Sequence, residues 1–423
     1  MNGSIDPKVF FQRLFQAAIE AADPARTIRA FLPPKPKGRT IVVGAGKGAA
    51  QMAVALEDAW NGPLEGVVVT RYGYGAPTRM VEIVEAAHPV PDEAGLAGTR
   101  RLLDSVAGLG PDDLVIALVC GGGSALLPAP AGDLTLADEM AVNEALLASG
   151  APISAMNTVR KHISAIKGGR LALAAHPARV VSLIVSDIPG DDPALVSSGP
   201  TVPDMASRAD ALAVIETYGM QLPDAVMQHL ASPAADAPKP DDPRFAGHEV
   251  HVIASAARSL EAASAAAEAQ GVPAVILSDA IEGEAREVGR VHAAIAREVA
   301  LRDRPFRKPV VLLSGGETTV TLGKSGGRGG RNTEFLLSLA LGIEGVPGIS
   351  AFAADTDGID GSEENAGAFA DHRTVARLRS AGHDAKALLA AHDAWGAFDA
   401  LGDLFVPGPT GTNVNDLRAV LVR

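Results

Sequence analysis

The chain has 423 residues, of which 47% are hydrophobic and only 4% aromatic, and its formal net charge is −13 at pH 7. This length favours two domains, and the acidic balance argues against general binding to nucleic acid or acidic membranes. The single cysteine, Cys120, excludes an internal disulfide and is typical of a reducing cytoplasm, where we expect the protein to reside. We expect neither a membrane span nor a signal peptide.

The first half of the chain alternates strand-like apolar runs with helical patterns, after an amphipathic helix expected within residues 1–22. The strand-like runs are Ile41–Val43, Val67–Thr70, Val81–Glu85, Leu114–Val119 and Val180–Val185. Such alternation predicts a parallel sheet covered by helices on both faces, so the predicted fold class is α/β.

A segment rich in proline, alanine and aspartate, Ser232–Pro243, is the best candidate for a linker. We therefore expect one domain at residues 1–235 and a smaller α/β domain at residues 244–423. Strand-like runs in the second half lie at 251–256, 274–279, 310–315 and 349–354, and helical patterns lie at Ala257–Gln270, Glu284–Arg302 and Glu334–Leu341. Because Gly367–Asp371 follows the last run too closely for a helical crossover, we expect a mixed sheet.

A glycine turn, GAGKGA at residues 44–49, joins the first of these strands to a helix. Gly46 lets the backbone approach an anion, and Lys47 adds a positive charge at the helix N-terminus; a solvated surface lysine is the alternative. The turn loosely matches a dinucleotide fingerprint. However, the next strand ends in Thr70 and Arg71, where an NAD enzyme needs an acid for the ribose.

A second glycine turn follows the strand that ends near Cys120. Gly121, Gly122 and Gly123 predict a nest of backbone N–H groups that suits a phosphate or a carboxylate. A Gly-x-Ser-x-Gly elbow would need a glycine where Leu126 stands, so we interpret Ser124 as a hydrogen-bond donor rather than a nucleophile.

Carboxylates follow two further strands. Asp187 and Asp191 follow one in the first half, and Asp355, Asp357 and Asp360 follow one in the second. An aspartate at the carboxyl end of a strand can hold Mg²⁺ or take a proton from an attacking hydroxyl. For each cluster a turn or a helix cap is the alternative.

Two segments are rich in cations. Residues 157–170 carry Arg160, Lys161 and Lys167 without an acid between them, which favours an anion-binding helix face over a solvated one. Residues 316–332, GETTVTLGKSGGRGGRN, combine glycines with three cations just before a helical pattern: Lys324, Arg328 and Arg331. This segment predicts a site for a phosphate-bearing ligand, with a flexible surface loop as the alternative.

Together these segments resemble the class II glycerate kinases, the glycerate 2-kinase family whose C-terminal part is called the MOFRL domain. The motifs that carry the resemblance are VGAGKGA, CGGGSALLPAP, NTVRKHISAIKGGRLA, SDIPGDDPALVSSGPTVPD, SGGETTVT with GGRGGRNTEFLLSLA, AADTDGIDG and PGPTGTNVNDL. They run in family order over nearly the whole chain.

The resemblance implies ATP- and Mg²⁺-dependent phosphorylation of D-glycerate to 2-phosphoglycerate. It also implies a Rossmann-like, three-layer first domain and an active site in a cleft between the domains. It assigns catalysis to Lys47 and to Arg331, with Arg328 as a rival, and to these we add Asp187. The expected nucleotide- or substrate-binding residues are Gly46, Gly121, Gly122, Gly123, Ser124, Arg160, Lys167, Glu317 and Arg328. The expected Mg²⁺ ligands are Asp191 and Asp355.

Two other functions stay open at this point: an NAD(P)-dependent hydroxypyruvate reductase, which the missing acid disfavours, and a nucleotide-binding regulator without catalysis. The expected partners are glycerate and ATP, with no nucleic acid and no membrane. Whether the protein forms a homodimer is left open.

Overall fold

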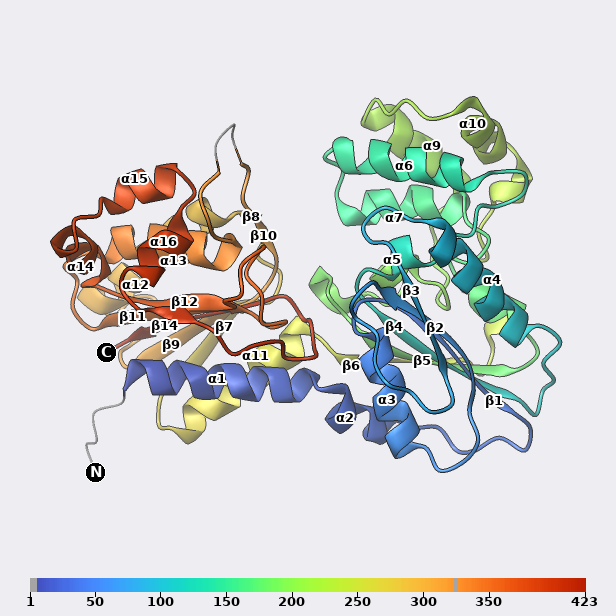
Figure 1. The fold of residues 1–423 in the computed structure, drawn as a ribbon, viewed down its shortest axis with the longest axis horizontal. Coiled ribbons are helices and arrows are strands. Elements are labelled where there is room, and N and C mark those ends of the chain that lie inside the picture. The colour runs from blue at the N-terminus through green and yellow to red at the C-terminus, as the bar shows by residue number, and fades with distance from the viewer. Residues whose placement is uncertain (1–5, 323–325) are drawn as a thin grey trace. The chain divides into compact units, whose positions relative to one another are not determined.

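The computed structural model describes residues 6–322 and 326–423, and Figure 1 shows its course. The chain divides into two compact units, each of which is described by itself. One comprises Pro24–Ile253, and the other combines Met1–Asp23 with Ala254–Arg423. Within the described ranges, no helix has the length and apolar character that a membrane crossing requires.

The unit Pro24–Ile253 is built on a six-stranded sheet of order β3-β2-β1-β4-β5-β6. The strands are β1 (Thr40–Ala45), β2 (Glu65–Arg71), β3 (Glu82–Ala86), β4 (Leu114–Cys120), β5 (Arg179–Val185) and β6 (Glu249–Ala254). Strands β1 to β5 pair in parallel, so their carboxyl ends meet at one edge of the sheet. This is the Rossmann-like strand order, which places ligands beyond that edge.

The helices of this unit are α2 (Pro24–Thr27), α3 (Ala49–Ala59), α4 (Glu93–Val106), α5 (Gly123–Leu126), α6 (Leu136–Ala148), α7 (Ile153–His162), α8 (Arg170–Ala174), α9 (Arg208–Thr217) and α10 (Asp224–Ala231). Helices α6, α7, α9 and α10 form a group of their own beside the sheet (Figure 1), around a buried apolar cluster that includes Val142, Val159 and Leu230.

The second unit has a six-stranded sheet of order β13-β12-β11-β14-β9-β7 and a two-stranded pair of β8 and β10. The strands are β7 (Ala274–Ser278), β8 (Gly283–Glu284), β9 (Val310–Ser314), β10 (Thr318–Thr319), β11 (Ile349–Asp355), β12 (Gly367–Asp371), β13 (Leu404–Phe405) and β14 (Asp416–Val422). β12 runs antiparallel to β11 and β7 runs parallel to β9, so the predicted mixed sheet is confirmed.

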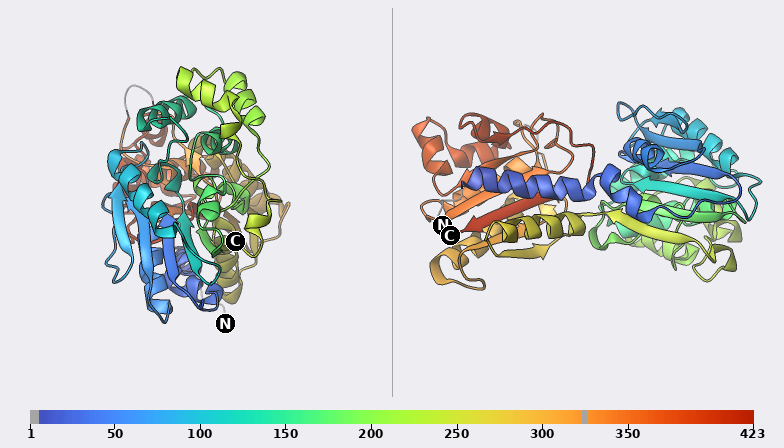
Figure 2. Two further views of the ribbon diagram at one scale, coloured as in Figure 1. Left: turned by 90° about the vertical axis from the view of Figure 1, so that its right-hand side faces the viewer. Right: turned by 90° about the horizontal axis from the view of Figure 1, so that it is seen from below.

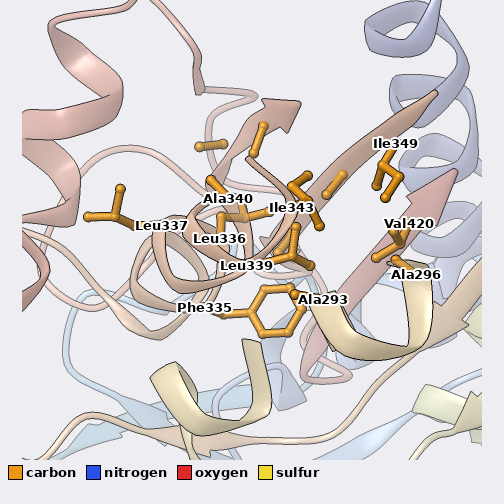
Figure 3. Close-up of a cluster of buried hydrophobic side chains, with 14 of the residues drawn as sticks. Ala293, Ala296, Phe335, Leu336, Leu337, Leu339, Ala340, Ile343, Ile349 and Val420 are labelled. Atoms are coloured by element: carbon orange, nitrogen blue, oxygen red, sulfur yellow. The ribbon is translucent and has the colours of Figure 1, made fainter. Parts of the chain in front are cut away.

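Helices cover both faces of this sheet: α1 (Pro7–Ala22) and α11 (Ala256–Ala269) on one, α12 (Ala285–Arg302) and α13 (Arg331–Ile343) on the other (Figures 1 and 2). Short helices α14 (Thr374–Ser380), α15 (Ala385–Ala390) and α16 (Ala394–Asp399) follow. Alternate strand residues supply the two cores, as the two-residue period of a strand requires. Leu312 and Val420 pack in the cluster around Phe335 that Figure 3 shows, whereas Leu313 and Leu421 pack toward α1.

The units of the structure differ from the domains expected at residues 1–235 and 244–423. Helix α1 belongs with the C-terminal part, because its Phe11 and Phe15 are buried against Phe352 of β11. The segment expected as a linker, Ser232–Pro243, folds into the first unit. Ala235 is fully buried there, and Arg170 donates to the carbonyl of Asp236.

Candidate functional site

The two predicted glycine turns lie side by side, because β1 and β4 are neighbours whose ends are in register. The backbone N–H of Lys47 donates to the carbonyl of Gly121 over 2.9 Å. Gly46 has φ 137°, and a Cβ there would lie 2.3 Å from the sulfur of Cys120. Glycine is therefore required at this position by both conformation and space.

Lys47 and Asp187 converge on the second glycine turn. A Cβ at Gly121 would lie 1.8 Å from a carboxylate oxygen of Asp187, and one at Gly122 would lie 3.3 Å from the Cγ of Lys47. The structure thus brings the predicted residues Gly46, Lys47 and Asp187 together at the Gly121–Gly123 nest, and Ser124 follows directly. A cation, a carboxylate and backbone N–H groups around one small space suit the binding of an anionic ligand.

His88 also faces this nest, and sequence reasoning missed it. Its Nε2 lies 3.1 Å from the position of a Cβ on Gly122. Burial and the positive charges of Lys47 and Arg71 lower the pKa of His88 to about 4. The imidazole is therefore neutral at pH 7, and the positive charge nearest to Gly122 is that of Lys47. The available signal was its place directly after β3, at the same edge of the sheet as the glycine turns.

Ser124 is held by a chain of hydrogen bonds. The amide of Asn157 donates to the carbonyl of Leu195 over 2.8 Å, so its Oδ1 is an acceptor, and Ser198 donates to it over 2.9 Å. Since the single hydrogen of Ser198 is used there, Ser124 must donate to Ser198 over their 2.7 Å contact. We expected Ser124 to donate to a ligand. In this network its hydrogen is already used, and its oxygen offers an acceptor instead.

The loop behind Ser124 is strained. Ser197 and Ser198 have φ values of 52° and 60°, in the left-handed region that non-glycine residues seldom adopt. Ser197 donates to the carbonyl of Cys120 over 2.6 Å, and a Cβ on Gly123 would lie 2.3 Å from the Ser197 hydroxyl. Such strain persists where the surroundings fix it, and it clusters at functional sites.

The cation-rich segment is not one helix face. Helix α7 ends at His162, and Lys167 lies beyond it, fully buried, with its ammonium 2.8 Å from Glu139 and 2.8 Å from the Leu127 carbonyl. Lys161 is likewise buried and paired with Asp204. The assignment of Lys167 to ligand binding is therefore corrected: its charge is neutralised inside the protein. Arg160 differs from both, because the atoms that it contacts are uncharged.

In the second unit, Arg331 stands at the start of α13 among three carboxylates. Its guanidinium lies 2.6 Å from Glu317, 2.6 Å from Asp355 and 2.9 Å from Asp416. Asp355 ends β11 and Asp416 begins the antiparallel β14, so the sheet places them opposite each other. The predicted residues Glu317, Arg331 and Asp355 therefore form one ion cluster.

The other predicted residues of this segment also have partners. Arg328 stacks on the ring of Trp395, 3.5 Å from its centroid, and pairs with Glu363 over 2.6 Å. Asp360 accepts hydrogen bonds from the backbone N–H groups of Asn332 and Thr333, so it caps α13. Burial raises the pKa of Asp360 to about 6. Lys324 lies outside the described residues.

The magnesium ligands stay a prediction. Both oxygens of Asp355 are used, one by Arg331 and the other by the backbone N–H of Asp357, which makes it a poor metal ligand in this arrangement. Asp191 lies on the loop after β5 with φ 53°, close in sequence to Asp187. In residues 6–322 and 326–423, no group of three side chains that could hold a metal ion is found.

Two family models match the chain. The Domain of unknown function DUF4147 covers residues 10–231, and the MOFRL family covers residues 310–416. A D-glycerate 2-kinase of Thermotoga maritima is 40% identical over 97% of each chain. The crystal structure of a glycerate kinase from that organism superposes with a TM-score of 0.89 at 39% identity, covering 98% of this chain and 99% of that one.

An Agrobacterium vitis protein with the name "Putative hydroxypyruvate reductase" is 53% identical over 99% of this chain and 95% of its own. The family models, the ordered motifs and the near-complete superposition agree with one another. The chain therefore belongs to the class II glycerate kinases, the glycerate 2-kinase family with a MOFRL domain.

Proposed function

We propose that this protein transfers the γ-phosphoryl group of ATP to the 2-hydroxyl of D-glycerate, giving 2-phosphoglycerate and ADP. The observation that carries the proposal is the convergence of Lys47 and Asp187 on the nest Gly121–Gly123. Phosphoryl transfer needs positioning and neutralisation of charge more than covalent chemistry, and these groups supply both.

In the proposed reaction, the 2-hydroxyl oxygen bonds to the γ-phosphorus, the bond from that phosphorus to the β–γ bridging oxygen breaks, and ADP leaves. Asp187 takes the hydroxyl proton, and Lys47 offsets negative charge on the transferring group. Mg²⁺, arriving with ATP, would neutralise phosphate charge, and Asp191 is the carboxylate we propose for it.

The names of the relatives support this substrate class, because relatives in Thermotoga maritima and Pyrococcus horikoshii bear the name of a glycerate 2-kinase. We propose glycerate and ATP as small-molecule partners, action in the cytoplasm, and no partner among nucleic acids or membranes. Self-association stays open. The expectation that Lys47 and Arg331 act on one substrate stays a prediction.

The reductase alternative has the Agrobacterium vitis name in its favour. Against it, β2 ends in Thr70 and Arg71, and the hydroxyl of Thr70 donates to the carbonyl of Gly46 over 3.1 Å. A side chain that closes the glycine turn in this way cannot serve as the acid that NAD enzymes place on the ribose.

One coupled experiment distinguishes the three candidate functions: the kinase, the reductase and the nucleotide-binding regulator. The protein is incubated with ATP, Mg²⁺ and D-glycerate, and the phosphoglycerate isomer is identified by ³¹P NMR. Oxidation of NADH and of NADPH with hydroxypyruvate is followed in parallel. We expect 2-phosphoglycerate and equimolar ADP. Exclusive formation of 3-phosphoglycerate would contradict the proposal, nucleotide oxidation without ADP would support the reductase, and neither reaction would support the regulator.

A further inference from the structure

Two cations of the segment 157–170 are neutralised by carboxylates of the protein itself. Lys161 pairs with Asp204, and Lys167 pairs with Glu139. Arg170 gives its hydrogen bonds to backbone carbonyls, among them those of Lys161 and Asp236. These three side chains are parts of the architecture of the unit.

Arg160 differs from the two lysines, because it is partly buried and its hydrogen bonds go to neutral side chains. Its Nε donates to Asn143 Oδ1 over 3.0 Å, and one Nη donates to Asn157 Oδ1 over 3.3 Å. In the part of the chain that the structure describes, no carboxylate lies within ion-pair distance of it. The acid whose charge acts on it is Glu139, which is already paired with Lys167. Burial accordingly lowers the pKa of Arg160.

A partly buried positive charge without a counter-ion is costly, so an anion that meets it is bound favourably. Two asparagine amides fix the guanidinium from one side, since the amide of Asn157 is itself held by the Leu195 carbonyl. Because Nε and one Nη are used by the asparagines, the remaining Nη hydrogens are those that can bind a carboxylate, and the fixed side chain lowers the ordering cost of that binding.

Arg160 also belongs to the candidate active site. Three hydrogen bonds, of 3.3, 2.9 and 2.7 Å, join it through Asn157 and Ser198 to Ser124. Ser124 directly follows the nest Gly121–Gly123, on which Lys47 and Asp187 converge. An anion bound to Arg160 would therefore be connected by this hydrogen-bond chain to Ser124, which adjoins the nest.

We propose that Arg160 is the residue that recognises the carboxylate of the hydroxy-acid substrate, and that Asn143 and Asn157 position it. The proposal rests on the proposed function and deepens it. The nest and Lys47 suit the phosphates, so the substrate carboxylate requires its own cation, and Arg160 is the cation of this network without an anionic partner among the described residues.

The test compares Arg160→Gln with Arg100→Gln. Gln at 160 can still bond to the asparagine amides but carries no charge, and Arg100 is exposed on α4, outside the site. We expect the KM for D-glycerate to rise about ten- to a hundredfold in Arg160→Gln, with the KM for ATP within about twofold of wild type and Arg100→Gln unchanged. A rise confined to the KM for ATP would overturn the proposal and make Arg160 a phosphate ligand.

A neutral analogue provides a second readout. Wild type should discriminate strongly between D-glycerate and its carboxamide, glyceramide, and Arg160→Gln should lose most of that discrimination. A purely structural residue would lower activity on both compounds equally. Unchanged discrimination in a folded Arg160→Gln protein would therefore contradict carboxylate recognition.

Failure of the proposed function has a different signature. If wild type forms no phosphoglycerate, that function fails, and calorimetric titration with D-glycerate and with inorganic phosphate still tests Arg160. Binding of D-glycerate that is lost in Arg160→Gln supports the proposal, and binding that survives overturns it. If Arg160→Gln does not fold, Asn143→Ala takes its place: it frees the guanidinium on one side, and a rise in the KM for glycerate alone is expected.

Discussion

At the scale of single residues, the nest Gly121–Gly123 depends on the absence of side chains at its glycines. A methyl group on Gly121 would overlap the carboxylate of Asp187, and one on Gly123 would overlap the hydroxyl of Ser197. Because these side chains are absent, the Asp187 carboxylate and the Ser197 hydroxyl lie close to the backbone of the nest, whose N–H groups would contact a ligand. Around this space, Lys47 is the cation whose position the backbone fixes most directly, through its bond to Gly121.

Replacement of Lys47 by alanine should lower kcat by about a hundredfold or more, because a preorganised charge near the transferring group is lost. The fold should persist, since the bond from residue 47 to the Gly121 carbonyl is made by the backbone. Initial rates with saturating ATP and D-glycerate, together with circular dichroism, check both parts. Lys37→Ala, at an exposed site, is the matched control. Wild-type turnover in a folded Lys47→Ala protein would make Lys47 a surface residue.

His292 should make stability depend on pH. Its Nδ1–H donates to the Val288 carbonyl over 2.8 Å, so its Nε2 accepts from the Ser314 hydroxyl over 2.9 Å, and burial lowers its pKa to about 4. The folded form binds fewer protons than the unfolded one between pH 6.5 and about 4. The stability that neutral His292 contributes is thus complete above pH 6.5, and about 3 kcal/mol of it is lost as the pH falls to about 4.

Urea unfolding of wild type and His292→Gln at pH 7.5 and 4.5 measures this effect. The difference in unfolding free energy between the two proteins should narrow markedly at the lower pH. An equal difference at both values would show that His292 titrates normally in the fold.

Sequence alone could place Lys47, Asp187 and the glycines, because each directly follows an apolar run that can only be a strand. It could not separate Arg160 from Lys167, since both looked like unpaired cations. The acid that neutralises Lys167 is Glu139, which lies on α6 and comes close only in the folded unit. It also could not show which way the hydroxyl of Ser124 is turned, because Asn157 and Ser198 decide this from distant segments.

At the scale of elements, the N-terminus of α13 is organised by carboxylates. Asp360 caps the helix, and Arg331 in its first turn binds Glu317, Asp355 and Asp416. Arg331 therefore has a structural role in this ion cluster in addition to the catalytic role that we predicted for it. A loss of activity on replacing Arg331 therefore has two physical causes that must be separated.

Arg331→Met should lower the unfolding free energy by about 3 kcal/mol, because Asp355 is then left buried without its counter-charge, whereas Asp416 keeps its ion pair with Arg418. The double variant with Asp355→Asn should recover part of this loss, since the carboxylate that has lost its partner is then uncharged. Urea unfolding of the single and double variants checks the effect, with exposed Arg373→Met as the control. A double variant no more stable than Arg331→Met would show that charge balance is not what holds the cluster.

The positions of strands β1 to β7, β9, β11 and β12 followed from the sequence, as did the mixed sheet. The central strand β14 was not predicted, and β6, which we expected in the second domain, pairs in the first sheet instead. The helix expected across residues 157–170 was shorter in the structure. Ser164 pairs with Pro130 outside α7, and Gly168 and Gly169 take positive φ values before α8 begins. The supposed linker Ser232–Pro243 failed for a different reason: its prolines and aspartates form turns that pack on Arg170 and Arg208.

At the scale of the whole molecule, the chain leaves one unit and later returns to it. Helix α1 starts in the unit that contains the C-terminus, and residues 24–253 form the other unit in between. Composition cannot show this, because an amphipathic N-terminal helix has the same pattern whichever sheet it covers. What decides it is the fit of Phe11 and Phe15 against Phe352, which lies on β11.

Phe15→Ala should therefore destabilise the C-terminal unit by about 3–5 kcal/mol, as the loss of a buried aromatic ring does. Phe15 is 2% exposed and contacts the ring of Phe405, with centroids 5.0 Å apart. Hydrogen exchange read by mass spectrometry should show faster exchange in α11 and β11 and unchanged exchange in β1 and β4. Val9→Ala, at a residue 44% exposed, is the control. Equal acceleration in both units would contradict the assignment of α1 to one of them.

The place of α1 also sets an order of events during synthesis. The helix leaves the ribosome long before β11 and β14, against which its phenylalanines pack. At about 5–20 residues per second, translation of residues 24–253 alone takes roughly 10–50 s. For that time Phe10, Phe11 and Phe15 have no final partner, while the unit between them and the C-terminus can complete its own sheet. A nascent chain therefore carries an exposed aromatic segment that chaperones can bind. In a circular permutant that begins at residue 254, α1 would be synthesised after β11 and β14, so this delay before its phenylalanines find their partners would disappear.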